Sequence, residues 1–198
     1  MRPVITTKPW GSRLAGLLVR PLVSTRVHPN HLTTLSLLTG LTAAALYGIG
    51  NRTAANWGAA RYLLTNLLDN ADGELARLAG KTSVAGGFYD RLCDLVVRVS
   101  LFMGMGLGLR AGPLGNWALL AGVAAAAAFV VIFALRSGLV RHEVVEAMDK
   151  PRGGGFDVGD ILNLVAPLTW LGVLEPFLVA TAVGAPLFCV WTARHRPR

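Results

Sequence analysis

Residues 69–94 read DNADGELARLAGKTSVAGGFYDRLCD, and this stretch places four aspartates in a chain that is otherwise composed like a membrane protein. An ionised side chain in hydrocarbon costs at least a few kcal/mol, and crowded carboxylates also repel one another. Such residues persist when divalent cations or a positively charged substrate offset both costs. The stretch therefore predicts a metal site. The four aspartates are Asp69, Asp72, Asp90 and Asp94.

The spacing of these aspartates predicts two carboxylate-bearing helix faces. On a helix with about 100 degrees per residue, Asp69, Asp72 and Ala76 share one narrow face. Asp90 and Asp94, four positions apart, share another. Two helices that each present two carboxylates form an oxygen-rich cleft of the kind in which Mg²⁺ or Mn²⁺ binds substrate phosphates.

Small residues accompany the aspartates and suggest room for a ligand. Gly73 and Ala76 would let a ligand approach the backbone, and Arg77 can hold phosphate oxygens in a fork. Gly86 and Gly87 open the helix that carries the second pair of aspartates. We expect them to let this helix pack against the preceding one, which would bring the two pairs of carboxylates together.

The pattern D-x2-D-G-x2-A-R-x8-G-x3-D-x3-D resembles the signature of the CDP-alcohol phosphotransferase (CDP-alcohol phosphatidyltransferase) family, and every fixed position is matched here. In addition, Pro29-Asn30-x2-Thr33 resembles the Pro-Asn-x2-Thr that opens the first membrane helix in many members. The resemblance implies transfer of a substituted phosphate from a CDP-alcohol, often CDP-diacylglycerol, to the hydroxyl of a second alcohol, with release of CMP. It also implies Mg²⁺ or Mn²⁺ as cofactor, as two ions.

The resemblance assigns roles to individual residues. Asp69, Asp72 and Asp90 match the metal ligands. Asp94 matches the residue that accepts the proton of the incoming hydroxyl, and it also matches a metal contact. The positions that match contacts to the CDP-alcohol are Gly73, Ala76, Arg77, Asn30 and Thr33. Asn30 has a second interpretation, because Pro29-Asn30 is also typical of a helix start at which Asn30 is the cap.

Composition predicts an all-α integral membrane protein with a single domain over residues 1–198. With 53% hydrophobic residues and a mean hydropathy of +0.51, the chain has too little polar surface for a soluble domain and enough length for about six spans of roughly 20 residues. We expect an interfacial amphipathic helix followed by six transmembrane helices. The expected ranges are 8–26 for the interfacial segment and 30–49, 54–78, 85–109, 114–136, 158–174 and 176–193 for the spans.

The distribution of lysine and arginine predicts the orientation, because cytoplasmic loops carry an excess of both. Of the 19 cationic residues, 15 fall in the N-terminal segment, in or beside the second connection, in the fourth connection, or at the C-terminus. The opposite side holds Arg52, Arg61 and Arg110, and Arg98 lies inside a span. Both termini and the aspartates are therefore expected to face the cytoplasm.

The net charge of +8 does not indicate a nucleic-acid-binding protein. The cations lie at the ends of spans rather than in a stripe interleaved with aromatic residues, which favours attraction to anionic lipid head groups. Segment 8–20 alternates cationic and apolar positions at helical spacing, so it is expected to lie in the membrane interface.

The acceptor alcohol stays open at this stage. Family members that use a phosphorylated polyol such as inositol phosphate carry a Lys-x-Arg-x-Glu type run at the cytoplasmic end of the fourth span. Only part of that cluster is present here, as Arg136 and Arg141. These arginines could bind the phosphate of inositol phosphate or glycerol 3-phosphate, but snorkelling at a helix end explains them equally well.

Other functions also remain open. A catalytically degenerate relative would bind CDP-lipid without releasing CMP. A small cation transporter would distribute its acidic residues across the depth of the membrane, whereas these aspartates cluster near one face. Small-residue stretches such as 104–108 would permit close helix packing and a homodimer.

Overall fold

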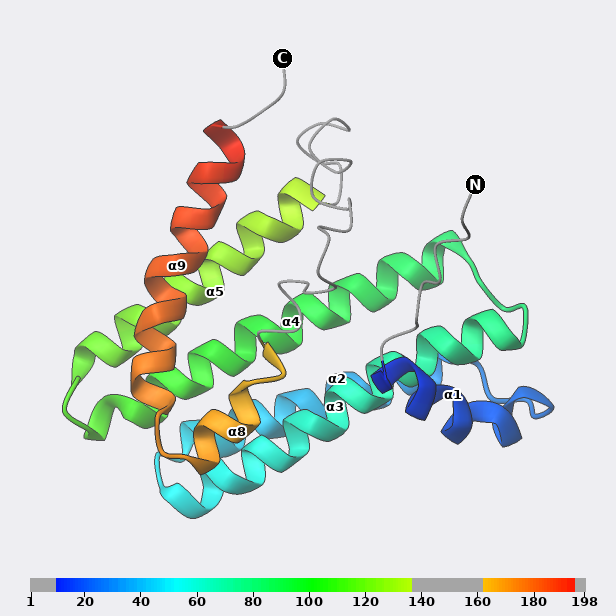
Figure 1. Cartoon of the computed structure of the whole chain (residues 1–198), viewed down its shortest axis with the longest axis horizontal. Coiled ribbons are helices and arrows are strands. Elements are labelled where there is room, and N and C mark those ends of the chain that lie inside the picture. The colour runs from blue at the N-terminus through cyan, green and yellow to red at the C-terminus, as the bar shows by residue number, and fades with distance from the viewer. Residues whose placement is uncertain (1–9, 137–161, 195–198) are drawn as a thin grey trace, which may run out of the picture.

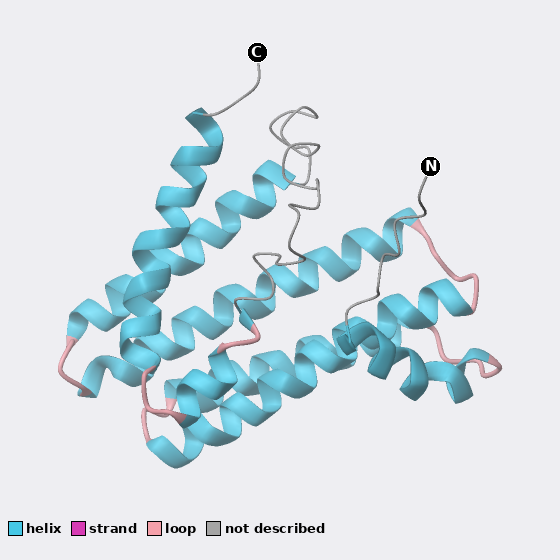
Figure 2. Cartoon of the chain, in the orientation of Figure 1, coloured by secondary structure: helices cyan, strands magenta, loops and turns pink. Residues whose placement is uncertain are grey.

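The computed structural model describes residues 10–136 and 162–194, and in these ranges the chain is helical with no strand (Figures 1 and 2). The expected all-α class is thereby confirmed for the described residues. The helices are α1 (Trp10–Val23), α2 (Pro29–Gly48), α3 (Arg52–Leu78), α4 (Val84–Gly108), the short 3-10 helix η1 (Leu109–Ala111), α5 (Asn116–Arg136), α8 (Val165–Trp170) and α9 (Leu174–Arg194).

Polar caps start the helices that carry the site. The Asn51 side chain accepts from the backbone N–H of Ala54 at α3, and the Ser83 side chain accepts from that of Gly86 at α4. At α2 the cap is His28, whose Nδ1 accepts from the backbone N–H of Asn30 at 3.3 Å. The interpretation of Asn30 as the cap is therefore wrong, since the imidazole one residue before Pro29 already performs that function.

Helix α2 lies at the centre of the site-bearing half of the molecule. Both α3 and α4 pack along α2 and make few direct contacts with each other (Figure 1). The expected direct packing of the third span on the second is therefore wrong. Instead α2 holds the two aspartate-bearing helices at a fixed separation. Helix α5 packs on α4, α9 packs on α5, and α8 packs on α3.

Glycines permit the close approach of α4 to α2. A Cβ on Gly104 would overlap the carbonyl oxygen of Ala44, and one on Gly108 would overlap that of Tyr47. Gly50, in the turn that follows α2, adopts a φ of +77° and lies against the backbone of Gly108. The small-residue stretch at 104–108 thus serves helix packing within the chain.

Three aromatic rings fill the junction of the later helices. Phe102 of α4 stacks on Phe129 of α5 at a centroid distance of 5.2 Å and on Phe177 of α9 at 6.5 Å. Phe102 itself is fully buried. This cluster fixes α5 and α9 against the face of α4 that points away from α2.

The chain departs from the expected continuous span at 158–174. From residue 162 onward, where the description resumes, residues 163 and 164 form a turn and α8 spans six residues. Pro167 explains the break, because its ring would clash with the carbonyl of Asn163 in a continuous helix and it has no N–H to bond to that carbonyl. The Asn163 side chain instead accepts a 2.8 Å hydrogen bond from Asn66 of α3.

Two helices in the described ranges are long and apolar enough to cross a membrane, at Val84–Ala111 and Asn116–Ala134. Helix α1 buries Ala15 and Val19 against Ala71 and Leu75 of α3. The opposite side of α1 exposes three leucines, Leu14, Leu17 and Leu18. An outward apolar surface of this kind is suited to lipid contact.

Candidate metal and substrate site

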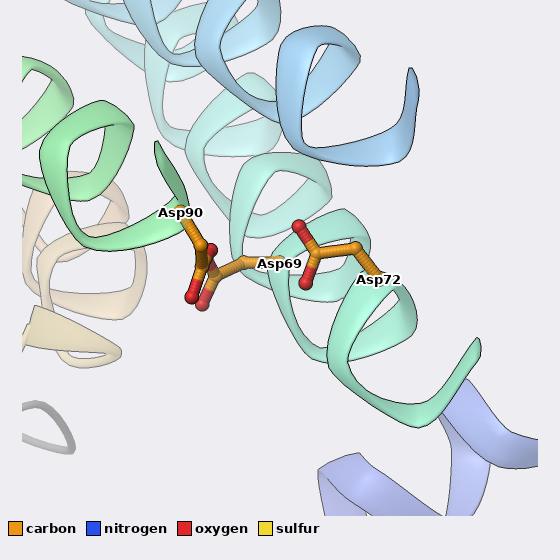
Figure 3. Close-up of side chains that lie close together, drawn as sticks. All are labelled: Asp69, Asp72 and Asp90. Atoms are coloured by element: carbon orange, nitrogen blue, oxygen red, sulfur yellow. The ribbon is translucent and has the colours of Figure 1, made fainter. Parts of the chain in front are cut away.

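Three of the four aspartates converge on one point. One carboxylate oxygen from each of Asp69, Asp72 and Asp90 lies within 4.8 Å of the other two. Figure 3 shows Asp69 and Asp72 projecting from α3 toward Asp90 on α4. The cluster therefore bridges the two helices that α2 separates.

Asp72 is the most deeply enclosed member of the cluster, with 4% of its surface exposed. Its Oδ2 accepts a 2.5 Å hydrogen bond from Oγ1 of Thr33 on α2. The same seam between α2 and α3 is polar further along, where the hydroxyl of Ser36 donates to the carbonyl of Thr65 at 3.2 Å. These bonds fix the rotation of α3 on α2 and so fix the direction in which Asp72 points.

Asp94 occupies a different environment from the other three. Its Oδ2 forms a salt bridge with the guanidinium of Arg98, one helical turn further along α4. It is still close enough to Asp69 and Asp90 for their negative charges to repel. Asp94 thus lies at the edge of the carboxylate cluster and already has a cationic partner.

Arg77 folds back along α3 toward the cluster. Its guanidinium donates to the carboxylate of Glu74 at 3.0 Å and lies 3.6 Å from the position of a Cβ on Gly73. The Arg77 side chain is 58% exposed, whereas the Glu74 side chain is 3% exposed. Glu74 therefore anchors an arginine whose outer face is accessible, above a glycine that leaves the backbone uncovered.

The start of α2 faces the start of α4. Oδ1 of Asn30 lies 3.4 Å from the position of a Cβ on Gly86, so Gly86 makes room for the amide of Asn30. A few residues on, the hydroxyls of Thr34 and Tyr89 are hydrogen-bonded at 2.9 Å. The motif glycine thus accommodates a residue of α2, not one of α3 as the sequence suggested.

The side chains of the two arginines proposed for the acceptor lie outside the described residues. Arg136 is the last residue of α5, and its side chain is outside the described part, as is all of Arg141. Ala76, which precedes Arg77 on α3 and is another candidate for contact with the CDP-alcohol, is half-buried.

The donor set fits a divalent cation. Carboxylate oxygens are the ligands that Mg²⁺ and Mn²⁺ prefer, and such ions are commonly held by few protein carboxylates together with substrate phosphates. The Thr33 hydrogen bond orients one of these carboxylates, which is the usual function of a residue behind a metal ligand.

Two of these partners lie outside the residues that the signature motif predicts. The sequence predicts Arg98 as a cation inside a span, and its position four residues after Asp94 is also the spacing of a helical ion pair. The contact between Thr34 and Tyr89 joins residues 55 positions apart, so only the packing of α2 on α4 reveals it.

Solved structures of known proteins share the fold of this chain. Solved structures of phosphatidylinositol phosphate synthase (PgsA1) from Mycobacterium tuberculosis have the same fold. The structure with CDP-DAG bound gives a TM-score of 0.71 at 20% identity, covering 92% of each chain. The structure in complex with manganese and citrate gives 0.69 at 20% identity, covering 93% of this chain and 87% of that one.

Two sequence matches complete the comparison. An archaetidylinositol phosphate synthase from Pyrococcus horikoshii is 35% identical over 89 residues, which is 45% of this chain and 46% of that protein. The matched segment therefore spans less than half the length of this relative. Residues 26–191 match the family described as CDP-alcohol phosphatidyltransferase, and the chain belongs to that family.

Proposed function

We propose that this protein transfers the phosphatidyl group of CDP-diacylglycerol, or of a related CDP-alcohol, to the hydroxyl of a second alcohol and releases CMP. The observation that carries the proposal is the convergence of Asp69, Asp72 and Asp90 between α3 and α4 in a member of this family. A solved structure with the same fold contains CDP-DAG, which supports the choice of donor.

The three clustered aspartates are the proposed ligands of two Mg²⁺ or Mn²⁺ ions. Bound there, divalent cations would neutralise charge on the pyrophosphate and on the departing CMP. A structure of the same fold contains manganese, which supports a divalent cation.

Asp94 is the proposed general base. In the reaction, the acceptor oxygen forms a bond to the lipid-side phosphorus, and the bond from that phosphorus to the bridging oxygen breaks. CMP leaves with the electron pair, and the proton of the acceptor hydroxyl passes to Asp94. A carboxylate committed to a metal is a weak base, so the aspartate outside the cluster is better suited to this function.

Donor binding is assigned to residues around the start of the cluster. The exposed face of Arg77 is suited to a pyrophosphate oxygen, and Gly73 leaves room for the ligand beside it. Ala76, Asn30 and Thr33 complete the proposed CDP-alcohol pocket. Thr33 acts there through Asp72, whereas Asn30 is available because His28 performs the capping.

A phosphorylated polyol is the proposed acceptor. The archaeal relative is named an archaetidylinositol phosphate synthase, and the solved neighbours are named phosphatidylinositol phosphate synthases. These names support inositol phosphate as the acceptor over serine or free inositol. Arg136 and Arg141 are the proposed phosphate contacts. Glycerol 3-phosphate has the same chemistry and is the alternative within this class.

The proposed setting is a bilayer crossed by six helices, with both termini and the aspartates on the cytoplasmic side and α1 in the interface. The leucines exposed along α1 and the positive charge bias support this arrangement. A homodimer is compatible with it.

The test is CMP release by the purified full chain in lipid, with CDP-diacylglycerol and Mg²⁺ or Mn²⁺. The acceptor panel contains inositol 1-phosphate, glycerol 3-phosphate, inositol and serine. Turnover with a phosphorylated polyol, lost in Asp94→Asn, is the expected result. Binding of CDP-diacylglycerol without CMP release for every acceptor would instead identify a degenerate, non-catalytic member.

A further inference from the structure

Arg98 is a cation placed deep in α4, beside the carboxylate cluster. It follows Asp94 by one turn, and its side chain is 27% exposed. Long side chains on a helix point back toward its N-terminus, so the guanidinium reaches toward the aspartates. No other Lys or Arg lies between Asp94 and the end of α4.

Asp94 stabilises the charge of Arg98 at this position in α4. An unpaired guanidinium in the middle of a membrane helix is strongly unfavourable, and it is tolerated where a carboxylate or a polar cavity accompanies it. Asp94 provides that partner through Oδ2. The field of Arg98 also reaches Asp69 and the buried Tyr62, so the guanidinium offsets part of the negative charge of the whole cluster.

The salt bridge with Arg98 places the two carboxylate oxygens of Asp94 in different surroundings. Since Oδ2 already accepts from Arg98, Oδ1 is the oxygen that we assign to the acceptor hydroxyl. A carboxylate oxygen that is paired with a guanidinium is a weaker ligand for a metal, so this salt bridge disfavours bidentate binding of an ion by Asp94. Among the described residues, the salt bridges present are Arg98 to Asp94 and Arg77 to Glu74, neither of which involves the other three aspartates, and the bond from Thr33 to Asp72 comes from a neutral hydroxyl.

On the basis of the proposed function, we propose that Arg98 is a positioning residue that holds Asp94 out of the metal cluster and presents its second oxygen as the base. Asp94 then differs in function from Asp69, Asp72 and Asp90 because of a residue outside the family signature. The arginine contributes no contact to the substrate itself. Its effect on the reaction passes through Asp94.

The test uses two measurements on the full chain in lipid bilayers. Mn²⁺ binding is followed by the loss of the free-ion signal in electron paramagnetic resonance, and kcat and KM are measured with CDP-diacylglycerol and the acceptor. The variants are Arg98→Gln, Arg98→Lys, Asp94→Asn and the double variant. Arg110→Gln is the matched control, because Arg110 is an exposed arginine in η1, far from the aspartates along α4.

The expected result is a change of opposite sign in the two measurements. Removing the cation frees Asp94 to join the cluster, so Arg98→Gln should bind Mn²⁺ tighter by about threefold to tenfold while kcat falls by about tenfold or more. Arg98→Lys should lie between Arg98→Gln and the wild type. In the Asp94→Asn background, Arg98→Gln should leave Mn²⁺ binding unchanged, and Arg110→Gln should match the wild type throughout.

A purely structural role would give a different pattern. Weaker Mn²⁺ binding together with lower kcat in Arg98→Gln, or an unchanged kcat, would overturn the assignment. If Arg98→Gln does not fold, Arg98→Lys decides in the same way, since a single ammonium cannot replace the planar fork. If the wild type shows no turnover with any acceptor, the proposed function fails, but tighter Mn²⁺ binding that depends on Asp94 would still support the positioning by Arg98.

Discussion

Thr33 on α2 and Asp72 on α3 are separated by 39 positions in sequence and joined by a 2.5 Å hydrogen bond between two buried side chains. Removing the Thr33 hydroxyl should therefore change the orientation of the Asp72 carboxylate, a proposed metal ligand, while leaving Asp72 itself unchanged. We expect Thr33→Val to weaken Mn²⁺ binding by about tenfold or more, because an orienting partner behind a ligand is typically worth that much. Calorimetric titration with Mn²⁺ measures this. Thr33→Ser, which keeps the hydroxyl, is the control, and equal binding by both variants would contradict the role.

Asp69 and Asp94 should respond differently to the same change. Asp69→Asn removes a carboxylate from the cluster of three, so Mn²⁺ binding and turnover should both be lost. Asp94→Asn should retain Mn²⁺ binding while kcat falls by about hundredfold or more, the range that a general base contributes. Parallel loss of Mn²⁺ binding in both variants would show that Asp94 is a full metal ligand.

Arg77 should affect the donor lipid more than the chemistry. The accessible side of its guanidinium is proposed to bind pyrophosphate, so Arg77→Ala should raise the KM for CDP-diacylglycerol by about tenfold. Arg77→Lys should recover only part of this loss, because an ammonium cannot form the same paired hydrogen bonds. The exposed Arg26→Gln serves as control, and an unchanged KM in Arg77→Ala would place the pyrophosphate elsewhere.

Gly104 should be intolerant of any side chain. A Cβ there overlaps the Ala44 carbonyl, so Gly104→Ala forces α4 away from α2 and should cost about 1–3 kcal/mol of stability. Thermal unfolding in detergent checks this. Gly184→Ala is the matched control, since no atom lies within 4 Å of the added methyl group and the change favours the helix. A similar melting temperature for both variants would show that the α2–α4 contact is looser than described.

The orientation can be tested with single cysteines introduced after Cys93 and Cys189 are replaced by serine. Thr82→Cys lies in the exposed connection between α3 and α4, and Arg110→Cys lies in η1 beyond the other end of α4. In intact cells an impermeant maleimide should label Arg110→Cys, and Thr82→Cys only after permeabilisation. The reverse pattern would invert the proposed topology.

The sequence predicted which aspartates form the cluster better than it predicted which helices pack together to bring them there. Helical spacing correctly indicated that Asp69 and Asp72 share a face, and the structure brings Asp90 to them. Spacing within a helix says nothing of which helices touch, however. The assumption that α3 packs on α4 was wrong because consecutive helices need not be neighbours, and the polar residues of α2 that bind α3 carry no periodic hydrophobic signal.

The break before α8 illustrates a second limit. The apolar run beyond residue 160 has the composition of a span, so composition alone favours one continuous helix. Pro167 was visible in the sequence, but a proline can either kink a helix or end it, and the choice depends on what the freed carbonyl and its neighbours bind. Here the side-chain oxygen of Asn163 accepts a hydrogen bond from the side chain of Asn66. Asn66 lies on α3, and the sequence did not specify the position of α3 relative to residue 163.

The neutrality of α2 has a consequence for the choice of metal. This helix has no acidic residue, yet its side chains and glycines set the gap between the two helices that have them. The space available to an ion therefore depends on residues such as Gly40, which lies directly beneath Val97 of α4. Selectivity between cations of different ionic radius can accordingly be tuned from a helix that supplies no acidic ligand, while the aspartate signature stays unchanged.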